Sequence, residues 1–182
     1  MTGVRERRGG RPKARELVFR VLYEAEITGD DAREVLALAF GRFRFTVEGR
    51  RYAEALLEAR LRHRTRLDRE LSTLLRNWEL ARLGATERAI LRLAAAELFH
   101  LRETPARVVL DEALRLAHRY GDPRSASFVN GVLDALGRKA RPGELRDRQG
   151  EEGPSRGEEA PSSGNGGPSP GEEASPGREP SL

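Results

Sequence analysis

The side chains with the clearest chemical capacity are the cations at the start of the chain: Arg5, Arg7, Arg8, Arg11 and Lys13. Guanidinium and ammonium groups displace the counterions of a nucleic acid, which gives affinity with little choice of sequence. Residues 1–141 carry 29 basic and 20 acidic groups, a net charge of +9, which suits a polyanionic partner. Arginine also outnumbers lysine by 31 to 2. A polyanion partner and a compositional bias therefore both remain open on charge alone.

No set of side chains in the sequence is typical of an enzyme site. The absence of cysteine excludes disulfides, Cys-ligated zinc and a thiol nucleophile. His63, His100 and His118 are scattered without the spacing of metal ligands. Asp111 and Glu112 are adjacent on a predicted helix, so their side chains diverge by about 100° and cannot act as a pair. No P-loop and no strand-linked GxGxxG is present, and we expect a non-enzymatic protein without a cofactor.

The C-terminal segment has a different composition from the rest of the chain. Of the 41 residues from 142 to 182, 30 are Gly, Pro, Ser or Glu, and the segment carries 4 basic and 9 acidic groups. Such a segment cannot bury enough apolar surface to offset its ordering entropy. We therefore expect a disordered acidic tail over 142–182. Neither an 18-residue apolar run nor a signal-peptide pattern is present, so we expect a cytoplasmic protein without a membrane span.

The elements that must position the cations are predicted to be helices. Apolar residues at helical spacing predict a first helix that ends near Thr28. Asp30 or Asp31 can cap a second helix that runs to about residue 40. Residues 43–47 alternate like a strand, but a single strand has nothing to pair with. We expect an extended loop there, with its Phe side chains inserted into the core.

The second half of the chain also has helical periodicity. We expect a long helix over 50–77 with Trp78 on its buried stripe. Thr86 can cap the next helix, and Thr104-Pro105 is a strong start for the one after it, which ends at Gly121. A last helix is predicted over about 125–138. The chain is therefore predicted to be all-α, with about seven helices.

The predicted helices fall into two antiparallel bundles packed on each other. We expect a basic N-terminal arm over 1–13, a first bundle over 14–78 and a second over 79–141. The last helix keeps Asn130-Gly131 in its interior, and an interior glycine costs about 1 kcal/mol relative to alanine. Close approach of a neighbouring helix or of a ligand would offset that cost.

Three stretches of the sequence carry a family pattern: 11–16 leading to 21–23, then 87–94 with 97–98, and finally 109–113 with 116–117 and 127–134. Together they resemble the NusB family of bacterial transcription antitermination factors. The last of them, which contains Ser127-Phe128-Val129-Asn130-Gly131, is the most specific. The resemblance covers about residues 11–138 and leaves the C-terminal tail outside.

The resemblance implies an all-α fold of two packed helical bundles and a role in transcription. Members of the family bind the boxA segment of ribosomal RNA leader transcripts jointly with NusE, a ribosomal protein. The complex acts on elongating RNA polymerase with other Nus factors and suppresses premature termination. The family is also associated with ribosomal RNA maturation.

The resemblance also implies candidate RNA-binding residues. A phosphate-binding rim would consist of Arg7, Arg8, Arg11, Lys13 and Arg15. Unstacked bases would be recognised by aromatic faces and polar side chains, for which the candidates are Tyr23, Phe128 and Asn130, with Arg92 as a further cation. Asp122 could tune affinity by repelling phosphate. Tyr23 and Phe128 can equally be core residues, because each lies on an apolar stripe.

The second bundle is implied to face NusE, with Glu87, Arg88 and Glu97 as the candidate contacts. Glu87 has an equally good structural explanation, because a carboxylate is favourable near a helix N-terminus. Simultaneous contacts to RNA and NusE would raise the effective concentration of the RNA at the polymerase.

Two other classes of protein remain as alternatives, and a third is disfavoured by the sequence. Some RNA methyltransferases carry a domain similar to NusB, but their chemistry requires a cysteine and a cofactor-binding α/β domain, and this chain lacks both. A general RNA-binding ribosome-assembly factor and a helical adaptor that binds only proteins are the other two.

Overall fold

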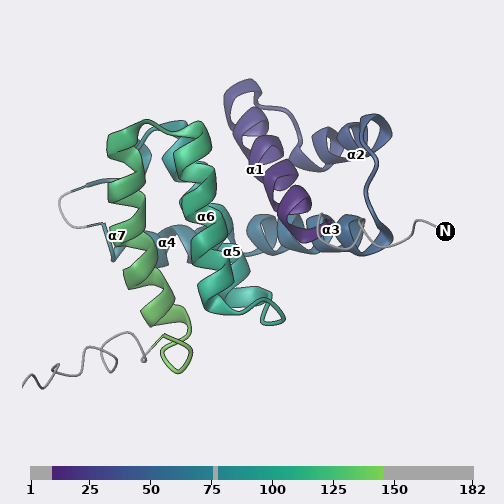
Figure 1. Ribbon diagram of the computed structural model, residues 1–182. Helices are drawn as coiled ribbons and strands as arrows, with labels where there is room; N and C mark the ends of the chain where they lie inside the picture. The colour runs from purple at the N-terminus through teal and green to yellow at the C-terminus, as the bar shows by residue number, and fades with distance from the viewer. Residues whose placement is uncertain (1–9, 76–77, 146–182) are drawn as a thin grey trace, which may run out of the picture. The chain divides into compact units, whose positions relative to one another are not determined.

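The computed structural model describes residues 10–75 and 78–145, apart from the side chain of Pro123, and in these ranges every regular element is helical. The described residues belong to one compact unit, Met1–Glu151. The elements are α1 (Gly10–Thr28), α2 (Ala32–Arg42), α3 (Val47–Arg62), α4 (Arg64–Ser72), the 3-10 helix η2 (Leu80–Arg82), α5 (Ala85–His100), α6 (Ala106–Tyr120) and α7 (Pro123–Ala140) (Figure 1). The predicted all-α class is confirmed.

The helices α2 and α3 both pack against α1. The inward side of α1 buries Ala14, Val18 and Phe19, and it contacts α2 and α3. The carboxylate of Asp31 accepts the amides of Arg33 and Glu34, so Asp31 is the cap that starts α2. The predicted end of the first helix at Thr28 and the start of the second are confirmed.

The predicted long helix over 50–77 is wrong, because the chain bends at His63. This residue ends α3 and precedes α4, and its backbone dihedrals (φ −106°, ψ 15°) are not helical. The bend is explained by two different packing partners, since α3 contacts α1 and α5 whereas α4 packs mainly on α5. Trp78, expected on a buried stripe, is 57% exposed.

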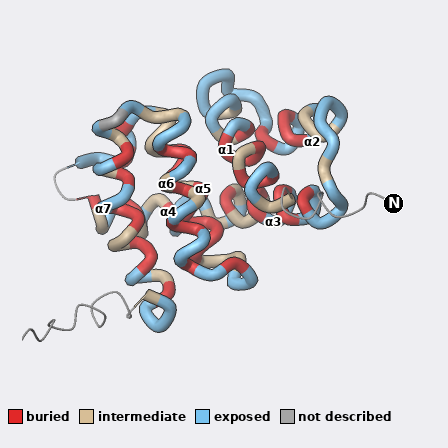
Figure 2. Tube along the Cα trace, viewed as in Figure 1, coloured by how far each residue is buried: buried red, intermediate tan, exposed pale blue. Residues whose placement is uncertain are grey.

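The central helix of the fold is α5. It contacts α1, α3, α4, α6 and α7, and much of its length is buried (Figure 2). Its six consecutive buried residues 93–98 point to all sides of the helix, as expected for a helix in a protein interior. The small side chains of Ala89 and of residues 94–96 let the surrounding helices approach closely.

Two predicted capping residues do not cap. The helix α5 begins one residue after Gly84 without a side-chain cap, and Thr86 lies inside its first turn. At the start of α6 the amide of Ala106 donates to the carboxylate of Glu144 at 2.6 Å. The hydroxyl of Thr104 is therefore not needed there. By contrast, α6 does end at Gly121, as predicted.

The predicted tail begins too early. Residues 142–145 follow Arg141, whose buried guanidinium donates to the backbone oxygens of Leu98 and Leu101. Leu145 then packs against the core. Residues 146–182, which hold the rest of the predicted tail, lie outside the described residues. The expected division into bundles at 78 and 79 stays a prediction. No helix among the described residues has the length and apolar character needed to cross a membrane.

Candidate nucleic-acid interface

A buried ion pair holds the N-terminal half of α1 against α5. The guanidinium of Arg15 donates through Nε to Oε2 of Glu97 at 2.7 Å and through Nη2 to Oε1 at 2.6 Å. Nη2 also donates to the hydroxyl of Tyr52 on α3 at 2.7 Å, and that hydroxyl donates to the same carboxylate. Because Arg15 is 2% exposed and Glu97 0% exposed, the three side chains join α1, α3 and α5 in the interior.

The surroundings of Arg15 in this network favour its charged form. Burial disfavours the charged guanidinium, but the hydrogen bond and the charge of Glu97 outweigh burial and raise the pKa of Arg15. Burial and the charge of Glu97 also raise the pKa of the Tyr52 hydroxyl. The predicted place of Arg15 on an exposed phosphate-binding rim is wrong, because its donors are used by Glu97 and Tyr52. The predicted place of Glu97 on a partner surface is also wrong, because its carboxylate is buried and accepts from Arg15 and Tyr52.

The other predicted rim residues have different surroundings. Arg11 is partly exposed and pairs with two exposed carboxylates, Glu48 at 3.1 Å and Glu103 at 3.3 Å. Lys13 is exposed, and no carboxylate of the described residues lies within ion-pair distance of it. Arg7 and Arg8 lie outside the described residues. Of the described rim residues, therefore, Lys13 is an unpaired exposed cation, and Arg11 is paired only with exposed carboxylates.

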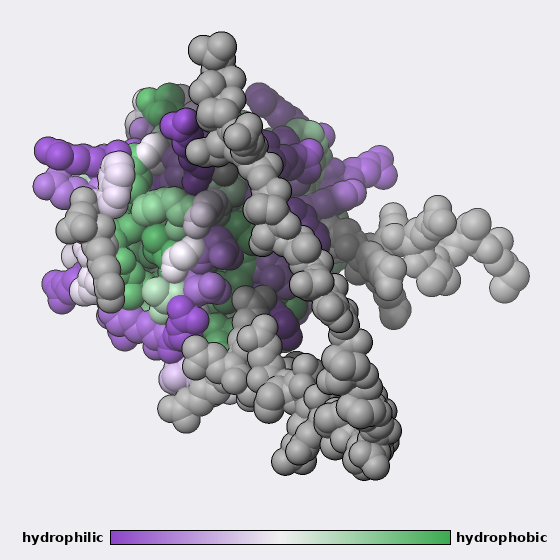
Figure 3. Space-filling model, turned by 60° about the vertical axis from the view of Figure 1, so that its left-hand side comes forward, coloured by the Kyte–Doolittle hydropathy of each residue, from purple (hydrophilic) through white to green (hydrophobic). Residues whose placement is uncertain are grey.

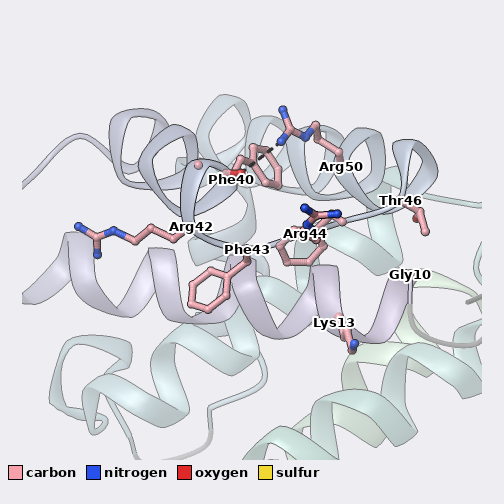
Figure 4. Close-up of a pocket in the computed structure, with 10 residues that line it drawn as sticks. Gly10, Lys13, Phe40, Arg42, Phe43, Arg44, Thr46 and Arg50 are labelled. Carbon is pink, nitrogen blue, oxygen red and sulfur yellow. Dashed lines mark hydrogen bonds between the residues drawn. The ribbon is translucent and has the colours of Figure 1, made fainter.

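Beside Lys13 is an open hollow of about 720 Å³ between the start of α1 and the loop that joins α2 to α3 (Figure 4). Its lining includes four cationic side chains and no carboxylate. The cations are Lys13, Arg42, Arg44 and Arg50. Arg50 lies over the ring of Phe40 at 4.6 Å, and none of the four has an ion-pair partner among the described residues. We call this hollow the basic pocket.

The basic pocket is formed by a short extended loop between two helix caps. Phe43 is the extended residue after α2, and the hydroxyl of Thr46 accepts the amide of Gly49 at the start of α3. A Cβ at Gly49 would lie 3.3 Å from the backbone oxygen of Gly10, so glycine permits the close approach of α1 and α3. This approach brings the start of α1 against the loop.

The two aromatic residues predicted to insert into the core from this loop differ. Phe45 packs edge-on against Phe40, with ring centroids 5.7 Å apart, and is partly buried. Phe43 is 53% exposed and lines the basic pocket, so the prediction is wrong for Phe43.

An aromatic cluster continues along α1 toward the end of α6. Tyr120 packs on Phe19 at 4.9 Å between ring centroids, and Phe19 in turn contacts Tyr23 at 6.3 Å. The hydroxyl of Tyr120 donates to Glu16 at 2.5 Å and accepts from Arg20 at 2.7 Å. Tyr23 is 39% exposed, so its ring is available to a partner at the edge of this cluster.

The start of α7 holds the remaining predicted RNA contacts. The carboxylate of Asp122 accepts the amides of Ser125 and Arg124 at 2.8 Å, and these bonds lower the pKa of Asp122. Asp122 is therefore a helix cap. Phe128 is half-buried, 6.2 Å from the ring of Trp78, whereas Asn130 is exposed. The side of the molecule that carries α7 shows apolar residues in its centre and hydrophilic residues around them (Figure 3).

Gly131 has open space where a Cβ would lie: apart from its chain neighbours and the backbone of its own helix, no described atom is within 4 Å. Close approach of a neighbouring helix, one of the two reasons expected for this glycine, is therefore not observed among the described residues. Approach by a ligand or partner remains a proposal.

Arg92 and Arg88 belong to a polar network between α1, α4 and α5. Arg92 donates to both oxygens of Asp68 and pairs with Glu26 at 3.1 Å. Arg88 pairs with Glu26 and donates to the backbone oxygen of Ala81 at 3.0 Å. Their cationic groups are thus neutralised within the fold, which contradicts the prediction of Arg92 as a cation available to RNA. Glu87 lies in the first turn of α5 and is partly exposed.

Four residues that line the basic pocket were not among those predicted from the sequence to bind RNA: Arg42, Phe43, Arg44 and Arg50. They lie at the end of α2, in the loop and at the start of α3. An aromatic residue flanked by arginines is typical of single-strand binding, but phenylalanine is usually buried, which favours insertion into the core. No group of three or more His, Cys, Asp or Glu side chains suitable for a metal occurs in the described part of the chain.

Comparison with known proteins identifies relatives over nearly all of the helical part. The profile described as NusB family matches residues 12–138. The transcription antitermination protein NusB of Oceanobacillus iheyensis is 36% identical over 126 residues, which cover 69% of this chain and 97% of that protein. The protein of the same name from Salinibacter ruber is 39% identical over 127 residues, covering 69% and 79% of the two chains.

Solved structures of the same family share the fold. T. maritima NusB superposes with a TM-score of 0.66 at 30% identity, covering 71% of this chain and 91% of that one. A crystal structure of the antitermination factors NusB and NusE in complex with double-stranded RNA gives a TM-score of 0.66 at 29% identity, with 72% and 98% coverage. The matched sequence, the shared helical fold and the relatives that match over most of their own length agree, and the chain belongs to the NusB family.

Proposed function

We propose that this protein is a transcription antitermination factor that binds the boxA RNA of ribosomal RNA leader transcripts together with NusE. It acts in the cytoplasm on the RNA polymerase elongation complex with other Nus factors, and it reduces premature termination. NusB proteins are antitermination factors rather than enzymes, so its activity is binding.

The observation that carries this proposal is the surface formed by unpaired cations and exposed polar and aromatic groups. Lys13 and the arginines of the basic pocket supply positive charge that no described carboxylate neutralises. Tyr23 and Phe128 offer ring faces, and the exposed amide of Asn130 offers hydrogen bonds to a base edge. Phosphate contacts provide affinity and base contacts provide choice of sequence. We also propose Arg7, Arg8 and Arg11 as phosphate contacts, while Asp122 acts on RNA only through the start of α7 that it caps.

The NusE contact is proposed for the surface around the start of α5. Glu87 is partly exposed there, and Trp78, which precedes η2, is largely exposed. Exposed aromatic residues are enriched in protein interfaces. Arg88 acts indirectly, because it holds residues 80–83 in place through the backbone oxygens of Ala81 and Leu83.

The test is fluorescence anisotropy of a labelled boxA RNA and of a scrambled RNA of the same length, each measured with and without NusE. We expect tighter binding of boxA than of the scrambled RNA, and a further gain for boxA alone when NusE is present, because two linked contacts raise the effective concentration. Equal binding of both RNAs that is unaffected by NusE would instead indicate a general RNA-binding factor. No RNA binding at all would indicate a protein-binding adaptor.

A further inference from the structure

We propose that the basic pocket is a second RNA subsite, which takes a single-stranded segment that flanks boxA in the same transcript. Two consecutive phosphates lie on the guanidinium groups of the loop, and one unstacked base lies on the exposed ring of Phe43. The inference rests on the proposed function, because it extends the path of the RNA that the protein binds.

Charge is the first argument for this occupant. The pocket gathers four cations from α1, the loop and α3, and its lining contains no Asp or Glu. Several arginines elsewhere in the described chain are matched by carboxylates, as Arg33 is by Glu58 at 2.6 Å and Arg92 by Asp68 at 2.8 Å. Like charges held together without a counter-charge favour an anionic ligand, and a phosphodiester chain supplies regularly spaced anions.

The aromatic residues are the second argument. Phe43 is 53% exposed at the boundary of two adjoining hollows, and a large apolar ring kept in water gains by being covered. Its neighbours Phe40 and Phe45 pack against each other and against the core, which anchors the loop. Base stacking on such a ring tolerates any sequence, because every base has a π-face. The pocket therefore suits a flanking strand rather than the sequence-specific element.

Continuity is the third argument. Gly10 and Lys13 line the pocket, so the start of α1 lies at its edge. On the other side, the hollow lined by Lys13, Leu17, Arg20 and Phe43 leads along α1 toward Tyr120 and Tyr23. Glu16 also lines that hollow, but Arg20 and Arg119 neutralise its carboxylate. One strand can thus follow α1 from the pocket to the candidate base-binding residues.

The experiment measures the affinity of the full-length protein for three labelled RNAs: the boxA element alone, and the element extended by a polyuridine segment at its 5′ or its 3′ end. We expect one of the two extensions to tighten binding by the wild-type protein. Phe43→Ala should remove at least about fivefold of affinity for that extended RNA. Arg42→Gln combined with Arg44→Gln should lower the slope of log affinity against log salt by about 1.4, since two single-strand phosphate contacts are lost.

Matched control variants separate these effects from general charge and exposure. Arg107→Gln with Arg138→Gln removes two exposed arginines of α6 and α7 and should leave the gain from the extension unchanged. Leu38→Ala removes a side chain of α2 that is also exposed and should be silent. Circular dichroism of each variant verifies that it folds.

The outcomes distinguish the subsite from the proposed function. If the wild-type protein prefers boxA but neither extension tightens binding, or if Phe43→Ala and the double arginine variant retain the gain, the subsite is wrong and the proposed function stands. In that case an acidic protein segment becomes the better occupant of the pocket. If the wild-type protein shows no preference for boxA, the proposed function fails first.

Discussion

Two cations near the start of α1, Lys13 and Arg15, lie close in sequence and have opposite surroundings. Arg15 is buried and bound by Glu97 and Tyr52, so its charge serves the fold. Lys13, two positions earlier, is exposed beside the arginines of the basic pocket, where the described residues supply no counter-charge. The basic residues of this chain thus serve two purposes: some form ion pairs within the fold, and others supply positive charge at the surface. Net charge therefore overstates the surface that can meet RNA.

Removal of the counter-charge of Arg15 should have the largest effect on stability. Glu97→Gln leaves a buried guanidinium without its carboxylate, and loss of one partner of a buried ion pair costs about 3–5 kcal/mol. Urea unfolding followed by circular dichroism measures the change. Arg33→Gln is the matched control, because it breaks an ion pair between two side chains that are about half exposed, and it should stay close to the wild type. Equal stability of the two variants would contradict the assignment of Arg15 and Glu97 to the fold.

The same contrast can be tested with two neighbouring residues of α7. Val129 is fully buried, so Val129→Ala should cost about 2 kcal/mol of folding stability and leave RNA affinity unchanged in the folded protein. Phe128→Ala should lower the preference for boxA with a smaller loss of stability, because Phe128 is only half-buried. Urea unfolding and RNA anisotropy, measured on both variants, supply the two quantities. If Phe128→Ala lost as much folding stability as Val129→Ala and the folded protein kept its normal affinity for boxA RNA, Phe128 would be a core residue.

A smaller effect is expected for the histidines that stack between α3 and α5. The rings of His63 and His100 are 3.9 Å apart and nearly parallel, and burial, His63 and Arg66 lower the pKa of His100. Because the folded-state pKa lies below the ordinary 6.5, the unfolded chain takes up this proton first. The contribution to stability is thus complete above pH 6.5 and decreases as the pH falls below it.

His100→Gln should therefore flatten the decline of stability below pH 6.5, as measured by thermal unfolding at several pH values. His118→Gln, which changes an exposed histidine of α6, serves as the control and should keep the wild-type decline. A decline that is the same in all three proteins would show that His100 does not contribute to it.

Much of the fold follows from local signals in the sequence, because helical periodicity and caps such as Asp31 act within a few residues. The break at His63 does not, since it reflects the different packing partners of α3 and α4. The exposed position of Trp78 has the same origin in tertiary packing. Thr104 has a good capping sequence, yet the amide of Ala106 is bonded by Glu144, a residue distant in sequence.

The candidate site could be predicted only in part. The basic start of α1 and the specific stretch of α7 were identified from residue types and the family resemblance, and these assignments remain proposals. Which arginines are paired depends on contacts between residues far apart in sequence, such as those of Arg15 with Glu97 and of Arg92 with Asp68. No local pattern distinguishes a buried arginine from an exposed one. The basic pocket was missed because it exists only where the loop meets α1.

The most direct test of the central claim is hydrogen–deuterium exchange of the full-length protein with and without boxA RNA. The claim is that RNA lies on the unpaired cations of the basic pocket and leaves the paired arginines of α5 untouched. We predict slower exchange in peptides that cover the start of α1 and residues 42–46, with no change over α5, where Arg88 and Arg92 are paired with carboxylates. Slower exchange confined to α5 would contradict the claim.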